Sequence, residues 1–187
     1  IRPDYEAAVS TALDVLIKRN DIDANRIGLA GVSLGGYYAP RAAAFESRVK
    51  AAVGNCGPWN LGECWDSSLP SLTRAAFQYH SGAKNEEEAK SNAYKLTLDG
   101  AAQRIKQPLL IIHGKLDRLI PWQQAHKIVD AVGKNAKLVM FENGNPLGKI
   151  SDNKARPAVV SHNLVLGINS PVSLSLVYSV KRTLMRA

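Results

Sequence analysis

A serine flanked by glycines carries the clearest chemical signal in this sequence. Gly31-Val32-Ser33-Leu34-Gly35 follows an apolar run at 26–30 that is typical of a buried strand, and it precedes an alanine-rich segment at 37–45 that is typical of a helix. A Gly-x-Ser-x-Gly turn between a strand and a helix holds the serine in a strained conformation with its hydroxyl exposed, so Ser33 is a candidate nucleophile. The backbone N–H of Leu34 would then be one oxyanion donor. The alternative is a glycine-rich turn with an incidental serine.

An attacking serine needs a base and a carboxylate, and Asp117 is the candidate carboxylate. A histidine takes the proton of the serine, and an acidic side chain fixes the tautomer of that histidine. Asp117 follows an apolar run at 109–113, so we expect it just beyond the carboxyl end of a strand, on the Ser33 side of the sheet. The alternative is an aspartate that only forms a turn.

The histidines differ in their setting. His113 ends a predicted strand in a His-Gly pair, and we interpret it as structural. His80 and His126 fall in predicted helices, where we expect surface or packing roles. His162 is the only histidine in the C-terminal tail and is considered as a displaced base, with an ordinary tail histidine as the alternative.

The elements that must position these residues alternate between helix and strand. A chain of 187 residues with 45% hydrophobic content can bury one core, so we expect one domain. Hydrophobic periodicity predicts helices over 5–18 and 122–132 and further strands over 49–54, 109–113 and 137–141. Strands that alternate with helices predict parallel βα units and an α/β fold.

Residues 56–100 break that rhythm. The segment is too long for a plain connection, which predicts a helical insertion over the carboxyl end of the sheet, with lid-like bounds at 57–100. Such an insertion would cap the site and line it with aromatic side chains. The alternative is ordinary packing of these rings, which are Trp59, Trp65, Phe77 and Tyr79. The acidic run at 86–88 is interpreted as a solvated helix face.

Two segments together resemble the α/β-hydrolase fold. Residues 21–28, which lead into the Gly-x-Ser-x-Gly turn, look like the prolyl-oligopeptidase and esterase branch. The stretch at 107–114, followed by Asp117 and Pro121, looks like the acid-loop segment of that branch. Within it, the dihydroxypseudooxynicotine-hydrolase-like and FrsA-like hydrolases are the nearer match. The resemblance covers about residues 1–145 and implies a partial α/β-hydrolase fold, the C-terminal half of a mainly parallel sheet, with catalytic residues in the order Ser, Asp, His.

The sequence departs from this family where the histidine is expected. The loop after the last predicted strand reads Glu142-Asn143-Gly144-Asn145-Pro146, and Pro146 stands at the position of the base. We therefore divide the chain into a catalytic-domain fragment at 1–146 and an atypical tail at 147–187. Within the tail, Ser170-Pro171 predicts a short helix that runs to Leu184. One hypothesis for the abrupt change is a shifted reading frame or different splicing near codon 146.

The beginning of the sequence also lacks parts that the resemblance implies. The first residue is Ile1 rather than methionine, and the strands that should precede the Ser33 strand are missing, with the loop that supplies a second oxyanion donor. The Ser33 strand is therefore expected at an exposed apolar edge, which favours pairing with other chains. We expect such a fragment to be weakly active or inactive.

Composition argues against several other classes. The net charge is +8, but residues 147–187 hold six basic side chains and one acidic one, and the other 146 residues hold 18 and 15. Because no basic stripe is interleaved with aromatic residues, nucleic-acid binding is not expected. The stretch at 158–180 makes a poor membrane span. Cys56 and Cys64 fit neither a zinc site nor a redox pair, so we expect buried thiols, no metal and no other cofactor, in the cytoplasm.

Two functions follow from these observations. The first is a serine hydrolase acting on a small-molecule or peptide carbonyl compound, by cleavage of an ester, a peptide or a carbon–carbon bond next to a ketone. The second is a non-catalytic binding or interaction protein of the same fold that has lost the histidine. Oligomeric state is not predicted from the sequence.

Overall fold

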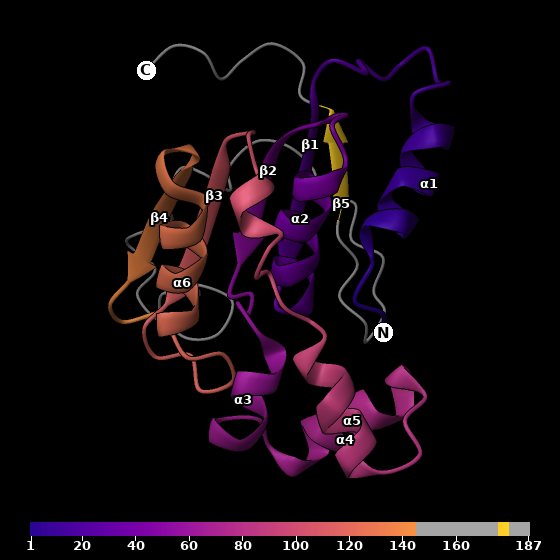
Figure 1. Cartoon of the computed structure of the whole chain (residues 1–187). Coiled ribbons are helices and arrows are strands. Elements are labelled where there is room, and N and C mark those ends of the chain that lie inside the picture. Colours follow the sequence, from indigo (N-terminus) through magenta and orange to yellow (C-terminus); the bar gives the residue numbers. More distant parts are fainter. Residues whose placement is uncertain (145–175, 180–187) are drawn as a thin grey trace.

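A five-stranded sheet forms the centre of the computed structural model, which describes residues 1–144 and 176–179. The strands lie in the order β4-β3-β2-β1-β5 (Figure 1). β1 to β4 run parallel, and β5 pairs with β1 in the antiparallel sense. The bounds are β1 Ile27–Val32, β2 Val49–Asn55, β3 Leu109–Gly114, β4 Ala136–Phe141 and β5 Leu176–Ser179. The predicted α/β fold with a mainly parallel sheet is confirmed.

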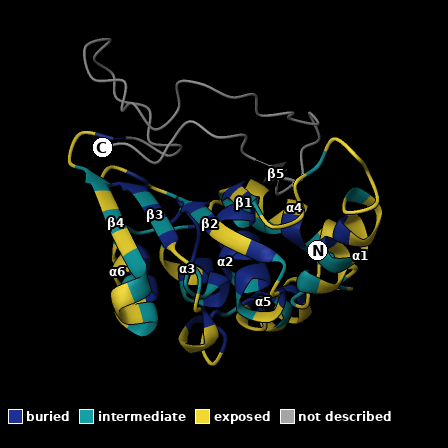
Figure 2. Cartoon of the chain, turned by 90° about the horizontal axis from the view of Figure 1, so that it is seen from above, coloured by how far each residue is buried: buried dark blue, intermediate teal, exposed yellow. Residues whose placement is uncertain are grey.

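Three helices lie against one face of this sheet. Figure 2 shows α1 (Glu6–Leu16), α2 (Leu34–Phe45) and α6 (Gln123–Val132) on the same side. α2 joins β1 to β2, and α6 with the short 3-10 turn η2 (Gly133–Asn135) joins β3 to β4. The strand side chains on this side form the core, with Leu29 and Ile111 almost completely buried. The short apolar runs in the sequence thus form strands because each buries one face under a helix.

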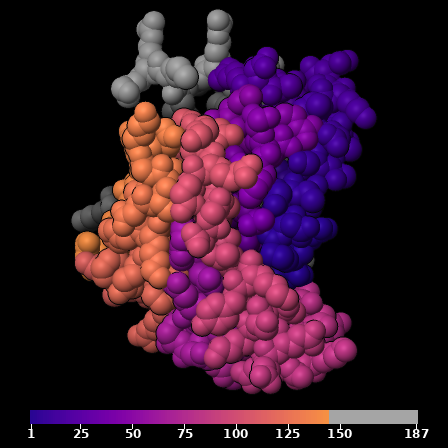
Figure 3. All heavy atoms as spheres, in the orientation of Figure 1, coloured from indigo at the N-terminus to yellow at the C-terminus, as the bar shows by residue number. Residues whose placement is uncertain are grey.

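The residues between β2 and β3 form the insertion that the sequence predicts to be helical. It contains α3 (Leu61–Ser67), α4 (Ser71–Ser81), α5 (Glu86–Tyr94) and the 3-10 turn η1 (Ala102–Arg104). Asn85 caps α5 by accepting a hydrogen bond from the Glu88 N–H at 2.8 Å. The three α-helices lie beyond the end of the sheet at which the parallel strands finish (Figure 1) and form the lower part of the molecular surface in Figure 3.

Gln124 on α6 fastens the start of the insertion to the rest of the domain. Its Oε1 accepts hydrogen bonds from the backbone N–H groups of Trp59 and Asn60 at 2.9 and 3.0 Å. Its Nε2 donates to Glu63 on α3 at 2.7 Å, and Lys127 pairs with the same carboxylate. Gln124 is 6% exposed, so its own hydrogen bonds are partly shielded from solvent and connect the start of the insertion to α6.

Two predictions about the tail and the sheet edge are wrong. Ile27 to Ala30 pair with Ser179 to Leu176, so the Ser33 strand β1 has β5 as a neighbour and is not the edge of the sheet. The tail segment from Ser170 to Leu184 is predicted as a helix, but its residues 176–179 form a strand. Valine, leucine and tyrosine suit a strand as well as a helix face, and pairing with β1 decides between them.

The described helices also bear on membrane association. Within residues 1–144, no helix is both long enough and apolar enough to cross a bilayer.

Candidate active site

Ser33 lies in a tight turn between β1 and α2. Its backbone angles are φ 57° and ψ −121°, a conformation that residues with a side chain rarely adopt. A Cβ on Gly31 would lie 2.0 Å from the carbonyl oxygen of Gly35, so only glycine fits there. The Ser33 N–H donates to the Asn55 carbonyl at 2.8 Å, which fixes the turn against the end of β2.

The backbone at Gly36 lies in close contact with the backbone at Gly57, where the chain enters the insertion. A Cβ on Gly36 would lie 2.7 Å from the Asn55 carbonyl oxygen, and a Cβ on Gly57 would lie 2.2 Å from the carbonyl carbon of Gly36. The first turn of α2 therefore touches the backbone that leaves β2. Because backbone contacts backbone, no side-chain movement can relieve a substitution at either glycine.

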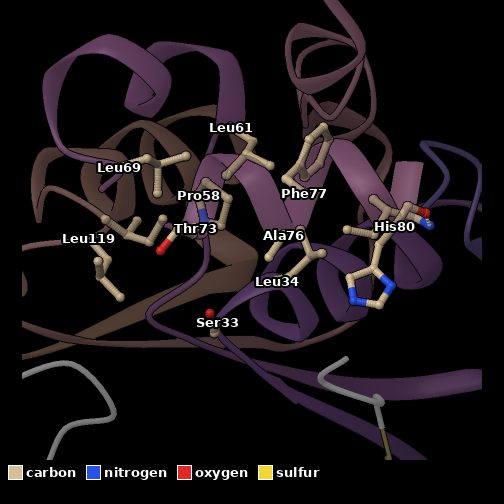
Figure 4. Close-up of a pocket in the computed structure, with 12 residues that line it drawn as sticks. Ser33, Leu34, Pro58, Leu61, Leu69, Thr73, Ala76, Phe77, His80 and Leu119 are labelled. Carbon is tan, nitrogen blue, oxygen red and sulfur yellow. Dashed lines mark hydrogen bonds between the residues drawn. The ribbon is translucent and has the colours of Figure 1, made fainter. Parts of the chain in front are cut away.

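The Ser33 side chain is available for chemistry. It makes no capping hydrogen bond to α2, it is half-buried, and its oxygen points towards a cavity beneath α4 (Figure 4). Leu34 is the first residue of α2, where backbone N–H groups have no partner within the helix. The N-terminal end of a helix carries partial positive charge, which stabilises an anion that forms beside it.

The cavity above Ser33 is small and mostly apolar. Its volume is about 180 Å³. Nine of its twelve lining residues have apolar side chains, and Ser33, Thr73 and His80 have polar ones. One of the nine, Ile1, carries the N-terminal ammonium group, which donates a hydrogen bond to the His80 carbonyl at 2.7 Å. The apolar lining residues are Ile1, Leu34, Pro58, Leu61, Leu69, Ala76, Phe77, Leu119 and Ile120. The predicted insertion contributes Pro58, Leu61, Leu69 and the α4 residues, so it forms most of one wall.

Asp117 lies in the loop after β3 and is held by backbone N–H groups. Its Oδ1 accepts from Leu119 at 2.8 Å and from Ile120 at 3.0 Å, and its side chain is 2% exposed. Leu119 and Ile120 line the same cavity as Ser33. The structure therefore brings the Asp117 loop and the Ser33 turn to one cavity, although Asp117 itself does not line it.

His113 supports the same loop from inside the core. It is completely buried, and its Nε2–H donates to the Ile120 carbonyl at 2.9 Å. This bond places the proton on Nε2, so Nδ1 is unprotonated, and no described residue donates to it. Burial lowers the pKa of His113, and the ring is neutral near pH 7. The geometry agrees with the interpretation of His113 as structural.

Cys56, His113 and Asp117 form a buried cluster in which a metal can be considered. One ligand atom of each lies within 4.8 Å of the others. Two of the donor atoms already have partners, because His113 Nε2 donates to Ile120 and Asp117 Oδ1 accepts two N–H groups. With three residues, the cluster is one ligand short of a closed four-ligand zinc site.

Both cysteines are buried and neither forms a disulfide within the described residues. Burial raises the pKa of Cys64 to about 12, so its thiol stays protonated and unreactive at neutral pH. This agrees with the expectation of buried thiols.

His80 is exposed on α4, in agreement with the expected surface role, and it also contributes to the cavity. It lies on α4 and lines the cavity with Thr73, Ala76 and Phe77 (Figure 4). These four residues follow the i, i+3, i+4, i+7 spacing of one helix face. The spacing is visible in the sequence, but it does not show which part of the molecule this face contacts. His126 is also exposed and packs edge-on against Trp122, in agreement with a surface role.

The two remaining predicted positions, Pro146 and His162, lie outside the described residues. Among the described histidines, His80 alone borders the cavity.

Comparisons with known proteins fit this geometry. The sequence model of the prolyl oligopeptidase family matches residues 7–155, about four-fifths of the chain. The chain belongs to the prolyl oligopeptidase family. The family match extends ten residues past Asn145, yet it contains no histidine after His126. The resemblance to this family is therefore confirmed.

Individual relatives are named as hydrolases. The chain is 32% identical over 147 residues to 2,6-dihydropseudooxynicotine hydrolase of Paenarthrobacter nicotinovorans, covering 78% of this chain and 39% of that protein. The crystal structure of the 2,6-dihydroxy-pseudo-oxynicotine hydrolase superposes with a TM-score of 0.73 at 32% identity, covering 79% of this chain and 42% of that one.

More distant structures share the fold alone. Acylaminoacyl peptidase of Pyrococcus horikoshii gives a TM-score of 0.62 at 21% identity, covering 78% of this chain and 25% of that one. The chain thus spans about two-fifths of the length of the curated hydrolases that it matches over most of its own length.

Proposed function

We propose that this chain is the nucleophile-bearing part of a serine hydrolase. The observation that carries the proposal is the backbone of Ser33, whose φ of 57° costs about 1–3 kcal/mol of strain and directs the hydroxyl to a cavity. Ser33 Oγ attacks the substrate carbonyl carbon, and the carbonyl oxygen becomes an oxyanion next to the Leu34 N–H. The leaving group departs, and water then attacks the acyl group and releases the acid.

Asp117 is proposed as the acid of the catalytic triad. Two N–H groups hold its Oδ1, which leaves Oδ2 to accept a hydrogen bond from the base. His162 is proposed as that base, because it follows Ser33 and Asp117 in the chain order Ser, Asp, His. The base takes the proton of Ser33 and later returns it to the leaving group.

The insertion is proposed to act as a lid over this site. Residues 57–100 supply seven of the twelve residues that line the cavity, and α4 lies across it from Ser33 (Figure 4). This supports a division into a catalytic unit at 1–146, with the lid at 57–100, and a separate tail at 147–187. A lid over a reacting serine excludes water and strengthens the electrostatic contacts to the oxyanion.

Turnover by this chain is expected to be low. Pro146 stands where the sequence pattern of the family has its histidine and has no group that takes up a proton, so His162 would have to act from a different position in the chain. A base held in the wrong position resembles a disabled member of a serine triad, which reduces kcat by about ten-thousand-fold. Acylation of Ser33 is therefore expected to be slow and measurable, with little repeated turnover.

The proposed substrates are carbonyl compounds of small-molecule or peptide size. The hydrolase and peptidase names of the relatives support a hydrolytic reaction. The bond that is cleaved is proposed to be an ester, a peptide or a carbon–carbon bond next to a ketone. The proposed steps need no cofactor.

Ester hydrolysis tests the proposal. We expect p-nitrophenyl butyrate to release p-nitrophenol in an initial burst of at most one equivalent, followed by a slow steady rate. The Ser33→Ala variant should show neither phase above the buffer background. Equal release by both proteins would contradict the proposal.

A second function remains a candidate because of Pro146. A protein of this family that lacks the base can still bind a carbonyl compound in the cavity without cleaving it. Folded protein that binds such a compound but releases no burst of p-nitrophenol would favour this binding role.

A further inference from the structure

One face of the central sheet, which we call the open face, has no described helix on it. α1, α2 and α6 lie together on the opposite face (Figure 2), and α3, α4 and α5 lie beyond the end of the sheet (Figure 1). Parallel sheets are found almost only where both faces are covered, because their strands carry apolar side chains on both sides. We propose that residues 157–175 of this chain bind across the open face.

The side chains of the open face form two rows that cross the sheet. Paired residues of neighbouring parallel strands share a face, and alternate residues of one strand point to opposite faces. The first row is Ala30, Val53, Leu110 and Lys137, and the second row is Val32, Asn55, Ile112 and Val139. Six of these eight side chains are apolar, so the open face is a mainly apolar surface.

Exposure separates the two faces of the sheet. Leu29 and Ile111, which point towards the helices, are 2% and 1% exposed. Val32 and Val139 on the open face are 38% and 36% exposed, although both belong to strands of the same sheet. A contiguous apolar surface of this kind marks a place where another part of a protein binds.

The chain leaves and re-enters the described fold at one end of the sheet. The described chain reaches Gly144, beyond the carboxyl end of β4, and β5 begins at Leu176, which pairs with Ala30 near the carboxyl end of β1. β4 and β5 are the two outer strands, four strand spacings or about 19 Å apart. Residues 145–175, which lie outside the described residues, connect these points. A chain of that length extends to about 100 Å, which is enough to cross the open face and return.

Residues 157–175 have a composition that suits an apolar surface. They contain no aspartate, glutamate, lysine or arginine, and five of the eight residues at 159–166 are valine or leucine. Residues 145–156, in contrast, hold three basic side chains and one acidic one. Burial of the uncharged part against the open face removes apolar surface of both from water. The charged part can remain in solvent beside β4.

The size of the open face favours a segment of the same chain over a second copy. Five strands span about 19 Å and six residues along a strand span about 20 Å, so the face measures about 400 Å². A stable interface between two proteins buries about 800 Å² on each partner. A segment joined to both edges of the sheet needs less area, because its local concentration is about millimolar.

Photo-crosslinking in the full chain tests the proposal. A benzophenone amino acid replaces Val139, because β4 is the strand farthest from β5 and Val139 lies on the open face. We expect irradiation to link this position to a residue within 157–175, as located by tandem mass spectrometry of the tryptic peptides. The matched control carries the benzophenone at Val15, which is 65% exposed on α1, and should give no link to 157–175.

The crosslinked partner identifies the occupant of the open face. In an equal mixture of isotope-labelled and unlabelled protein, only a link between two chains gives peptide pairs of mixed mass. Such pairs would assign the face to a second copy. Links to residues 145–156 alone would show a chain that only continues along β4, and folded protein without links would show a face in contact with solvent. Each of these results would overturn the proposal.

A second measurement keeps the native side-chain volume. Val139→Thr replaces a methyl group with a hydroxyl group of similar size, which destabilises the fold only where the side chain is covered by apolar groups. We expect it to lower the midpoint of thermal unfolding by about 2–8 °C, and the matched variant Val15→Thr to lower it by less than about 1 °C. Equal shifts would contradict the proposal.

This outcome is independent of the proposed reaction. Neither measurement uses the reactivity of Ser33, so a protein that gives the expected crosslinks but no burst of p-nitrophenol would reject the hydrolase and keep the covered face. A burst that needs Ser33, without crosslinks from Val139 to 157–175, would keep the hydrolase and reject the covered face.

Discussion

The turn around Ser33 and the loop around Asp117 lie at the same end of the sheet but are held in different ways. Glycine contacts fix the turn, because backbone lies directly against backbone at Gly31 and Gly36. Hydrogen bonds to side chains fix the loop, through Asp117, His113 and Ser68. The difference shows that one candidate catalytic residue depends on the absence of side chains and the other on their presence.

The largest loss of stability is expected from a substitution in the turn around Ser33. Gly31→Ala places a Cβ 2.0 Å from the Gly35 oxygen and should reduce the free energy of unfolding by at least about 4 kcal/mol, or prevent folding. Gly100→Ala is the control, because Gly100 has φ 71° but nothing within 4 Å of its Cβ position. It should cost only the backbone strain, about 1–2 kcal/mol. Urea denaturation of both variants measures this, and equal losses would contradict the steric account.

In the loop, the expected effect depends on which atoms are removed. Asp117→Ala leaves the Leu119 and Ile120 N–H groups without an acceptor and should cost about 2–4 kcal/mol. Asp117→Asn keeps an oxygen acceptor and should cost less than half as much. Hydrogen exchange at the two amides should accelerate in the alanine variant alone. The loop account fails if both variants lose the same stability.

The buried His113 predicts a pH dependence of stability. Its pKa in the folded protein is lowered from 6.5, so the unfolded chain binds a proton first as the pH falls. The contribution of His113 is therefore complete well above pH 6.5 and decreases as the pH falls through that value. Comparison of unfolding free energies at about pH 7.5 and about pH 5.5 should show this decrease in the wild type and in His126→Gln. It should be absent in His113→Gln, and persistence there would refute the assignment.

The smallest loss of stability is expected from a substitution at Ser68, where the insertion contacts the Asp117 loop. Ser68 Oγ donates to the Leu119 carbonyl at 2.7 Å, so Ser68→Ala should cost about 1 kcal/mol. Ser67 also donates to a backbone carbonyl, that of Glu63, but only within α3. Thermal unfolding of Ser67→Ala should therefore show the smaller loss. Equal losses would mean that the contact between Ser68 and the loop contributes nothing.

The sequence reveals the turn more completely than the loop. Gly31 and Ser33 are identified by the motif because the steric requirement is local and leaves a fixed pattern of residue types. Asp117 is also identified from the sequence, because it comes shortly after the predicted strand at 109–113. The bond between Ser68 and Leu119 joins residues 51 apart, and no local pattern marks it.

Two features could not be predicted for similar reasons. The pairing of β1 with β5 joins residues about 150 apart, and an apolar segment such as 176–179 suits either a helix or a strand until its partner is known. The direction of α4 relative to the cavity is set by the packing of Phe77 against Trp65. The surface position of His80 is therefore predicted from the sequence, but its contribution to the cavity is not.

Labelling of the folded protein with a fluorophosphonate tests the central claim most directly. The reagent forms a covalent bond with an activated serine, and mass spectrometry of the digested protein locates the adduct. The account predicts one adduct on Ser33, at a rate that is slow for the family and lower still in Asp117→Asn. It also predicts no adduct in Ser33→Ala. Folded protein that stays unlabelled, or an adduct on another serine, would contradict the assignment of Ser33 as the nucleophile.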